Sequence, residues 1–139
     1  MIQARGLCGK VHALRMGPGE DVRLGLQDWA VRSGVRAGAV ISAVGSLGPC
    51  SLRLAGRTEA TILEQDLELL TLSGTIGPDG AHLHATVSGP DGAVLGGHVL
   101  AGCRVRTTME LVILELEGVV LHRRPDPGTG SSELVPAQH

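Results

Sequence analysis

Hydrophobic and polar positions along the chain predict one helix near the N-terminus and strands almost everywhere else. An opening strand is expected over residues 4–16. Acidic residues, a helical apolar face and then Gly34 predict a helix over about residues 20–34, because acids suit the start of a helix and glycine suits its end. The apolar residues of this face are Val22, Leu26, Trp29 and Ala30.

Apolar runs beyond the helix are short and separated by glycine and proline, a pattern typical of strands. Short strands are expected between residues 37 and 55, a longer one over 63–76, and one partly buried on both faces over 109–117. The proline-, glycine- and serine-rich tail, residues 123–139, is expected to run as an extended loop over the surface. The pattern therefore predicts an α+β fold, mainly antiparallel β-sheet with one principal helix.

Length and composition predict a single domain, residues 1–139. The formal net charge of −2 produces no overall attraction to nucleic acid or anionic lipid. There is no basic stretch followed by an apolar run of signal-peptide type and no run of about 18 apolar residues, so we expect a cytoplasmic protein without a membrane partner. Cys8, Cys50 and Cys103 lack a Cys-x-x-Cys pair and are expected to be reduced thiols.

Three of the six histidines fall between residues 82 and 98, and they are the main chemical signal in the chain. His82 and His84 would project from the same face of a strand, because side chains two residues apart share a face. Three imidazoles on one face, with room for water at a fourth position, form the ligand set of a catalytic or exchangeable zinc. A His-x-His pair also arises from strand alternation alone, so both readings stand at this point.

The turn after His84 decides whether His98 joins the other two histidines. The residues Pro90-Asp91-Gly92 suit a three-residue hairpin loop, which puts His98 opposite His84. A two-residue loop would place His98 on the opposite face, because a shift of one residue reverses every side chain. The Gly96-Gly97 pair leaves space beside His98 for a close backbone approach or for an open coordination position.

Several short motifs occur in a fixed order along almost the whole chain. They are Gly19-Glu20-Asp21, Ala37-Gly38, Gly45-Ser46-Leu47, Leu52-Arg53, Leu67-Glu68-Leu69-Leu70, Leu72-Ser73-Gly74, His82-Leu83-His84, Gly96-Gly97-His98, Glu110, Asp126, Thr129-Gly130 and Leu134. In this order and spacing the chain resembles the plants and prokaryotes conserved (PPC) domain family, whose bacterial members are often labelled DNA-binding proteins. The resemblance implies an α+β fold similar to that of acetolactate decarboxylase, assembly as a homotrimer, and a histidine group that holds a metal ion, Zn²⁺ or another divalent metal, near a subunit boundary.

One functional hypothesis is a metal-binding trimer that binds or acts on a small anionic ligand. His82, His84 and His98 would be the metal ligands, and the guanidinium of Arg53 a clamp for the anion. Glu20 and Glu110 are candidates for an acid or base. Arg53 also suits a charge satisfied at a surface or interface, and Glu110 a support for the metal ligands or a trimer contact.

Two other hypotheses stay open beside the metal-binding one. DNA association would use the alternating pair Arg104 and Arg106 and the pair Arg123-Arg124, but fourteen acidic residues outnumber twelve basic ones. The AT-hook that gives plant members of the PPC family their DNA binding is also missing here. A non-catalytic assembly module, in which the histidines bind nothing, is the third hypothesis.

Overall fold

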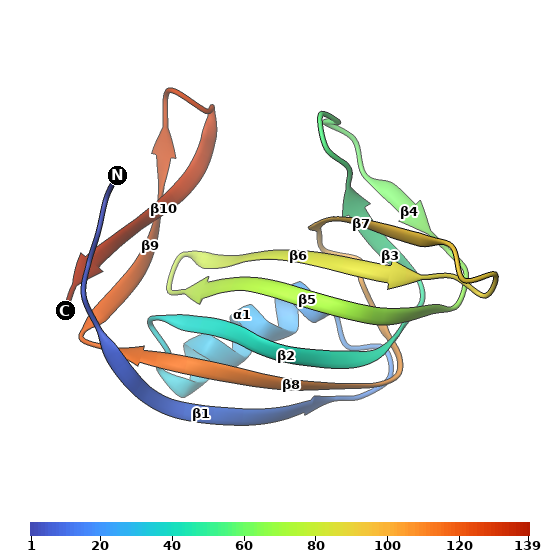
Figure 1. Ribbon diagram of the computed structural model, residues 1–139, viewed down its shortest axis with the longest axis horizontal. Helices are drawn as coiled ribbons and strands as arrows, with labels where there is room; N and C mark the ends of the chain where they lie inside the picture. The colour runs from blue at the N-terminus through green and yellow to red at the C-terminus, as the bar shows by residue number, and fades with distance from the viewer.

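The computed structural model describes all 139 residues and contains one helix, an eight-stranded sheet and a separate two-stranded sheet (Figure 1). Every strand pair is antiparallel, and the strand order of the large sheet is β1-β8-β2-β5-β6-β7-β3-β4. In chain order the elements are β1 (Leu7–Met16), α1 (Val22–Ser33), β2 (Gly38–Leu47), β3 (Cys50–Arg53), β4 (Thr61–Leu63), β5 (Leu67–Gly77), β6 (Gly80–Ser88), β7 (Val94–Val99), β8 (Val105–Glu117), β9 (Val119–Asp126) and β10 (Ser131–Gln138). The α+β class predicted from the sequence is confirmed.

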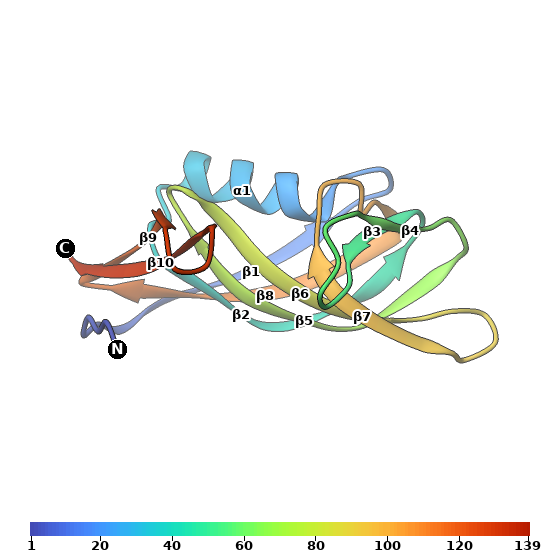
Figure 2. The same ribbon diagram turned by 90° about the horizontal axis from the view of Figure 1, so that it is seen from above.

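Helix α1 packs against one face of the large sheet, and the opposite face carries no helix (Figure 2). Asp21 caps the helix, since its Oδ1 accepts the Leu24 N–H at 3.0 Å, and Gly34 ends it in the left-handed conformation at φ 70°. Val22, Leu26 and Ala30 are buried in the main core, so the predicted apolar face is confirmed.

Two of the expected strand segments are divided differently in the structure. The segment expected to form short strands holds one long strand, β2, of ten residues, and one short strand, β3, of four. β2 pairs with β8 along one edge and with β5 along the other. Gly45 has a partner on both sides, so this glycine does not interrupt the strand. The expected strand over residues 63–76 is two elements, because Leu63 ends β4 and β5 begins at Leu67.

The prediction of a looped C-terminal tail is wrong. Strands β9 and β10 form a regular hairpin from Val119 to Gln138, and the residues between 127 and 130 make its turn. The proline content misled the prediction, since Pro125 and Pro136 lie in a two-stranded sheet. Each strand there has one free edge, where a residue without an N–H is tolerated.

The prediction of three reduced thiols is correct only for Cys8, which is free and exposed. Cys50 and Cys103 are joined in a disulfide within the main core. The segments that carry them are adjacent because the Arg104 N–H donates to the Pro49 carbonyl at 2.9 Å, a long-range contact with no signal in the sequence. No helix of the chain has the length and apolar character needed to cross a bilayer.

Candidate metal centre and the pocket beside it

The hairpin of β6 and β7 places the three histidines, and its register confirms the three-residue loop. The Gly89 N–H donates to the Ala93 carbonyl at 2.9 Å, and Gly92 takes the left-handed conformation at φ 80°. His84 and His98 are therefore directly opposite each other in the β6–β7 ladder. Leu83, between the two β6 histidines, points into the core and is fully buried, so the histidines project from the face away from α1.

The glycines beside His98 serve close packing of the strands. A side-chain Cβ at Gly97 would lie 2.8 Å from the Arg53 carbonyl oxygen, and one at Gly96 would lie 2.9 Å from the Ala85 carbonyl oxygen. Of the two roles expected for this pair, the close backbone approach is the one that these distances support. The glycines thereby let β7 sit tightly between β3 and β6, which fixes the position of His98.

The three imidazole rings converge on one point. The Nε2 atoms of His82 and His84 lie 3.2 Å apart. Each of the three histidines offers a ring nitrogen, and these nitrogens all lie within 4.8 Å of one another. Two ligands at about 2.0 to 2.1 Å from a tetrahedral zinc would be separated by about 3.3 Å, so the spacing of the first pair fits such an ion.

The lowered pKa values of two of these histidines also suit metal binding. Burial, and after it the positive charge of Arg53, lower the pKa of His98 to about 4. Burial is likewise the main cause that lowers the pKa of His82, followed by the charge of Arg123. Both imidazoles are therefore neutral at pH 7 and keep a lone pair for a metal ion. Nδ1 of His98 is buried without a hydrogen-bond partner, an arrangement that a bound ion or ligand would relieve.

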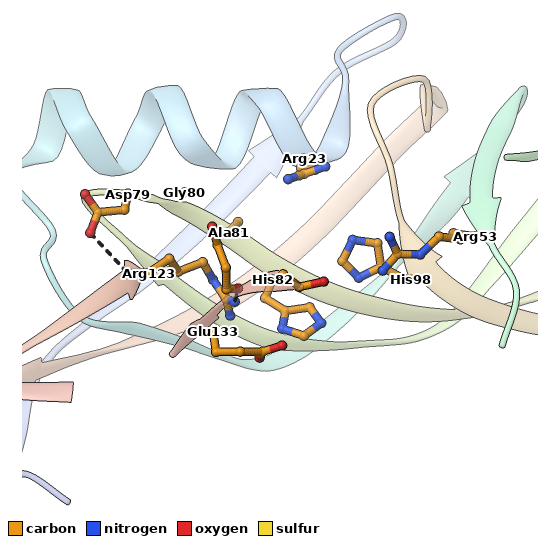
Figure 3. A pocket seen from close by; sticks show the side chains of 11 residues that line it. Arg23, Arg53, Asp79, Gly80, Ala81, His82, His98, Arg123 and Glu133 are labelled. Atoms are coloured by element: carbon orange, nitrogen blue, oxygen red, sulfur yellow. Dashed lines mark hydrogen bonds between the residues drawn. The ribbon is translucent and has the colours of Figure 1, made fainter. Parts of the chain in front are cut away.

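A polar pocket of about 440 Å³ adjoins the histidines. It lies where β7 has ended and the first residues of β6, from Gly80 to Leu83, have no partner strand on that side. Figure 3 shows Arg23 reaching toward it from α1, Arg53 beside His98, and Arg123 with Glu133 on the other side. The lining residues are Arg23, Arg53, Asp79, Gly80, Ala81, His82, His98, Arg123, Ser131, Ser132 and Glu133.

Of the three other residues proposed for the metal-binding hypothesis, Arg53, Glu20 and Glu110, only Arg53 lies at this site. It pairs with His98 in the β3–β7 ladder and lines the pocket. Glu20 lies before the helix and accepts the Gly17 N–H at 2.5 Å. Glu110 lies on β8, three strands from β6 or about 14 Å at the usual strand spacing. Within one chain, the two glutamates are not brought to the histidines.

Two arginines of the pocket, Arg23 and Arg123, were missed as site residues in the sequence. Arg23 follows the first buried residue of α1, where an arginine usually marks a solvated helix face. Arg123 was counted only as part of a basic pair in the tail. Ser131, Ser132 and Glu133 were missed for the same reason, since the tail was expected to be a loop. The adjacent apolar residues Leu134 and Val135 were the one signal that this part of the tail packs against the domain.

Comparisons with known proteins agree with this architecture. The profile of the Plants and Prokaryotes Conserved (PCC) domain matches residues 3–117. The bifunctional protein GlmU of Synechococcus sp. strain JA-3-3Ab is 44% identical over 125 residues, which are 90% of this chain and 20% of GlmU. The chain thus spans about a fifth of the length of this curated relative.

Solved structures are similar over almost the whole chain. A hypothetical protein from Salmonella enterica matches with a TM-score of 0.92 and 38% identity over 98% of both chains. The metal-containing protein AF0104 from Archaeoglobus fulgidus matches with a TM-score of 0.83 and 26% identity over 96% of this chain and 99% of that one. A Bacteroides thetaiotaomicron protein provisionally described as DNA-binding has a TM-score of 0.75 at 19% identity, covering 93% and 96% of the two chains. From the profile match, this chain belongs to the Plants and Prokaryotes Conserved domain family.

Proposed function

We propose that this chain is a metal-binding protein that holds zinc through His82, His84 and His98 and binds a small anionic ligand beside the metal. The observation that carries the proposal is the convergence of three imidazoles, two of them 3.2 Å apart through their Nε2 atoms. The description of the Archaeoglobus fulgidus relative as metal-containing supports it. The likeness to acetolactate decarboxylase remains an analogy of fold and brings no activity with it.

The residues around the histidines define what the site can do. A zinc ion held by the three histidines would supply a Lewis acid to a ligand in the pocket. Arg53 places a fixed positive charge next to His98, where an anionic group of a ligand would lie. Glu20 and Glu110 receive no acid or base role within one subunit, because neither reaches the histidines. Metal and ligand binding therefore form the proposal, and catalysis is not part of it.

Elemental analysis tests the metal site. The protein is stripped with a chelator, reloaded with zinc and freed of excess metal before the zinc content per chain is measured. We expect about one zinc per chain in the wild type and a large loss in His84→Gln and His98→Gln, since each removes one of three ligands. His139→Gln is the matched control, because His139 is an exposed histidine at the C-terminus. Wild-type protein without zinc, or His98→Gln with undiminished zinc, would contradict the proposal.

DNA association is the alternative function, and the structure gives it less support. The arginines that suggested it are engaged within the chain: Arg106 with Asp66 at 3.6 Å, Arg104 with the Gly19 carbonyl at 2.9 Å. Arg123 and Arg124 do not form a free basic patch either, since one lines the pocket and the other pairs with a carboxylate at 2.7 Å. The DNA-binding description of the Bacteroides protein concerns that protein, and at 19% identity the likeness shows only the fold.

A further inference from the structure

We infer that the pocket beside the histidines is an oxyanion site built by Arg23 and Arg123, and that its ligand is a small molecule with a carboxylate or phosphate group. The C-terminal hairpin of β9 and β10 forms the wall of this site. The inference rests on the proposed function for the adjacent metal, and it adds the residues and the ligand chemistry that select the anion.

The first argument is uncompensated positive charge. Three arginines line the pocket from three different elements, Arg23 from α1, Arg53 from β3 and Arg123 from β9. None of them takes part in a salt bridge. Nε of Arg23 is buried without a hydrogen-bond partner, so one guanidinium donor already lacks the acceptor that a buried donor needs.

The two carboxylates that line the pocket offset only part of the charge of these arginines. Asp79 accepts hydrogen bonds from His122, from the Arg123 backbone N–H and from Arg124, and these three contacts occupy its Oδ2. Glu133 accepts the Thr129 hydroxyl at 2.9 Å. Two carboxylates therefore face three arginines, which leaves an excess of positive charge for a ligand to balance.

Arg23 and Arg123 also influence each other. Burial is the main cause that lowers the pKa of Arg123; the charge of Glu133 raises it, and the charge of Arg23 lowers it. Two like charges close enough to repel each other are stabilised together by an anion placed between them. A planar guanidinium fork can bind a carboxylate or a phosphate through two parallel hydrogen bonds, which is why arginine suits both groups.

The remaining lining residues indicate a polar ligand of small size. Ser131 and Ser132 add hydroxyl groups, and Ala81 is the one apolar side chain of the pocket. A volume of about 440 Å³ lies at the small end of the usual range for ligand sites, which is about 300 to 1,000 Å³. An apolar ligand would leave the buried Nε of Arg23 without an acceptor, so the lining disfavours that class.

The β9–β10 hairpin forms one wall of this pocket. The match to the family profile ends at residue 117, and β9 begins at Val119. Arg123, Ser131, Ser132 and Glu133 therefore come from a segment beyond the matched region. The hairpin is held to the domain by the Leu121 N–H, which donates to the Arg36 carbonyl at 3.0 Å, and by Gln138, which donates to the Arg5 carbonyl at 2.9 Å. It acts as a fixed wall that selects the anion beside the histidines.

Isothermal titration calorimetry with two probes tests the site. Zinc-loaded protein freed of excess metal is titrated with inorganic phosphate in one arm and with succinate in the other. We expect at least one probe to bind, and Arg23→Gln and Arg123→Gln each to weaken it about tenfold or more, as expected for the loss of a charge-assisted pair. Arg123→Lys, which keeps the charge and loses the fork, should weaken it less. Preference for phosphate or for succinate identifies the anionic group.

The matched control is Arg32→Gln, which removes an exposed arginine of the same helix that pairs with Asp28. Its anion affinity should equal that of the wild type, and melting temperatures and zinc content identify variants that fail to fold. Zinc-loaded protein that binds neither probe at about 10 mM overturns the inference and leaves the metal proposal intact. Anion binding that survives both glutamine variants also overturns it. Anion binding that needs both arginines in a protein that takes up no zinc supports the site and overturns the metal proposal.

Discussion

At the scale of single residues, Asp79 positions one wall of the pocket. It lies in the turn between β5 and β6, and its Oδ2 accepts the Arg123 N–H at 3.0 Å and the side chains of His122 at 2.8 Å and Arg124 at 2.7 Å. The hydrogen bond from His122, and then that from the Arg123 backbone, lower the pKa of Asp79 below its ordinary value. One carboxylate thus joins the sheet turn to β9.

The lowered pKa of Asp79 predicts a pH-dependent contribution to stability. A carboxyl group whose pKa is lower in the folded than in the unfolded chain stabilises the fold above its unfolded pKa, and the contribution is lost as the pH falls through the folded pKa. Asp79→Asn should therefore melt at a lower temperature than the wild type at pH 7. The difference should hold down to about pH 5 and shrink toward pH 3.

Thermal melting in the presence of a chelator measures this difference without a contribution from metal binding. Asp28→Asn is a suitable control, since Asp28 forms only an exposed pair with Arg32 on α1. Such surface pairs contribute little to stability, so the control should melt close to the wild type. A gap between Asp79→Asn and the wild type that grows as the pH falls would show that the sign of the linkage is wrong.

At the scale of elements, the histidine hairpin was predictable because its determinants are local. Turn chemistry over Pro90-Asp91-Gly92 sets the loop length, the loop length sets the register, and the register places His98 opposite His84. The helix was equally accessible, because its apolar spacing and its capping residues lie within one segment. For these two elements the prediction needed no knowledge of distant contacts.

The parts that could not be predicted depend on contacts between distant segments. Arg23 and Arg123 are one hundred positions apart, and only the folded chain brings α1 and β9 to one pocket. The disulfide joins residues 53 positions apart and has no spacing signal. The β9–β10 hairpin was hidden by its prolines, whose usual meaning changes in a two-stranded sheet with free edges.

Shortening the loop between β6 and β7 tests the role of register. Pro90→Thr combined with Asp91→Asn places an Asn-Gly pair at positions 91 and 92 without a change of chain length, which favours a two-residue loop closed by residues 90 and 93 and a hairpin shifted by one residue. His98 would then move to the opposite sheet face, and the zinc content should fall strongly. Asp91→Ala keeps the loop length and should retain zinc. Full zinc content in the shortened variant would mean that strand pairing, and not the loop, holds the register.

At the scale of the whole molecule, the sheet face without a helix is unusually apolar. Val11, Ile41, Val44 and Leu70 are 46 to 61% exposed. They lie on β1, β2 and β5. Ala43 and Leu69, beside Val44 and Leu70, belong to the core on the helix side, and Val40, beside Ile41, packs against it. His12, beside Val11, contacts Trp29 of α1. Exposed apolar groups clustered on one face mark an interaction surface. We therefore propose that neighbouring subunits of the expected homotrimer cover this face.

Light scattering tests the assembly. A trimer has a mass of about 43 kDa, three times that of the 14.3 kDa chain. Val44→Lys should dissociate it, because a charge buried at an apolar interface is costly. Val31→Lys is the matched control, since Val31 is exposed on α1, on the other side of the molecule, and its variant should keep the trimer mass.

A wild-type mass near 14 kDa at micromolar concentration would rule out the trimer. A trimer that survives Val44→Lys would instead place the subunit contacts at another surface, with the unpaired edge of β6 beside the histidines as the next one to test.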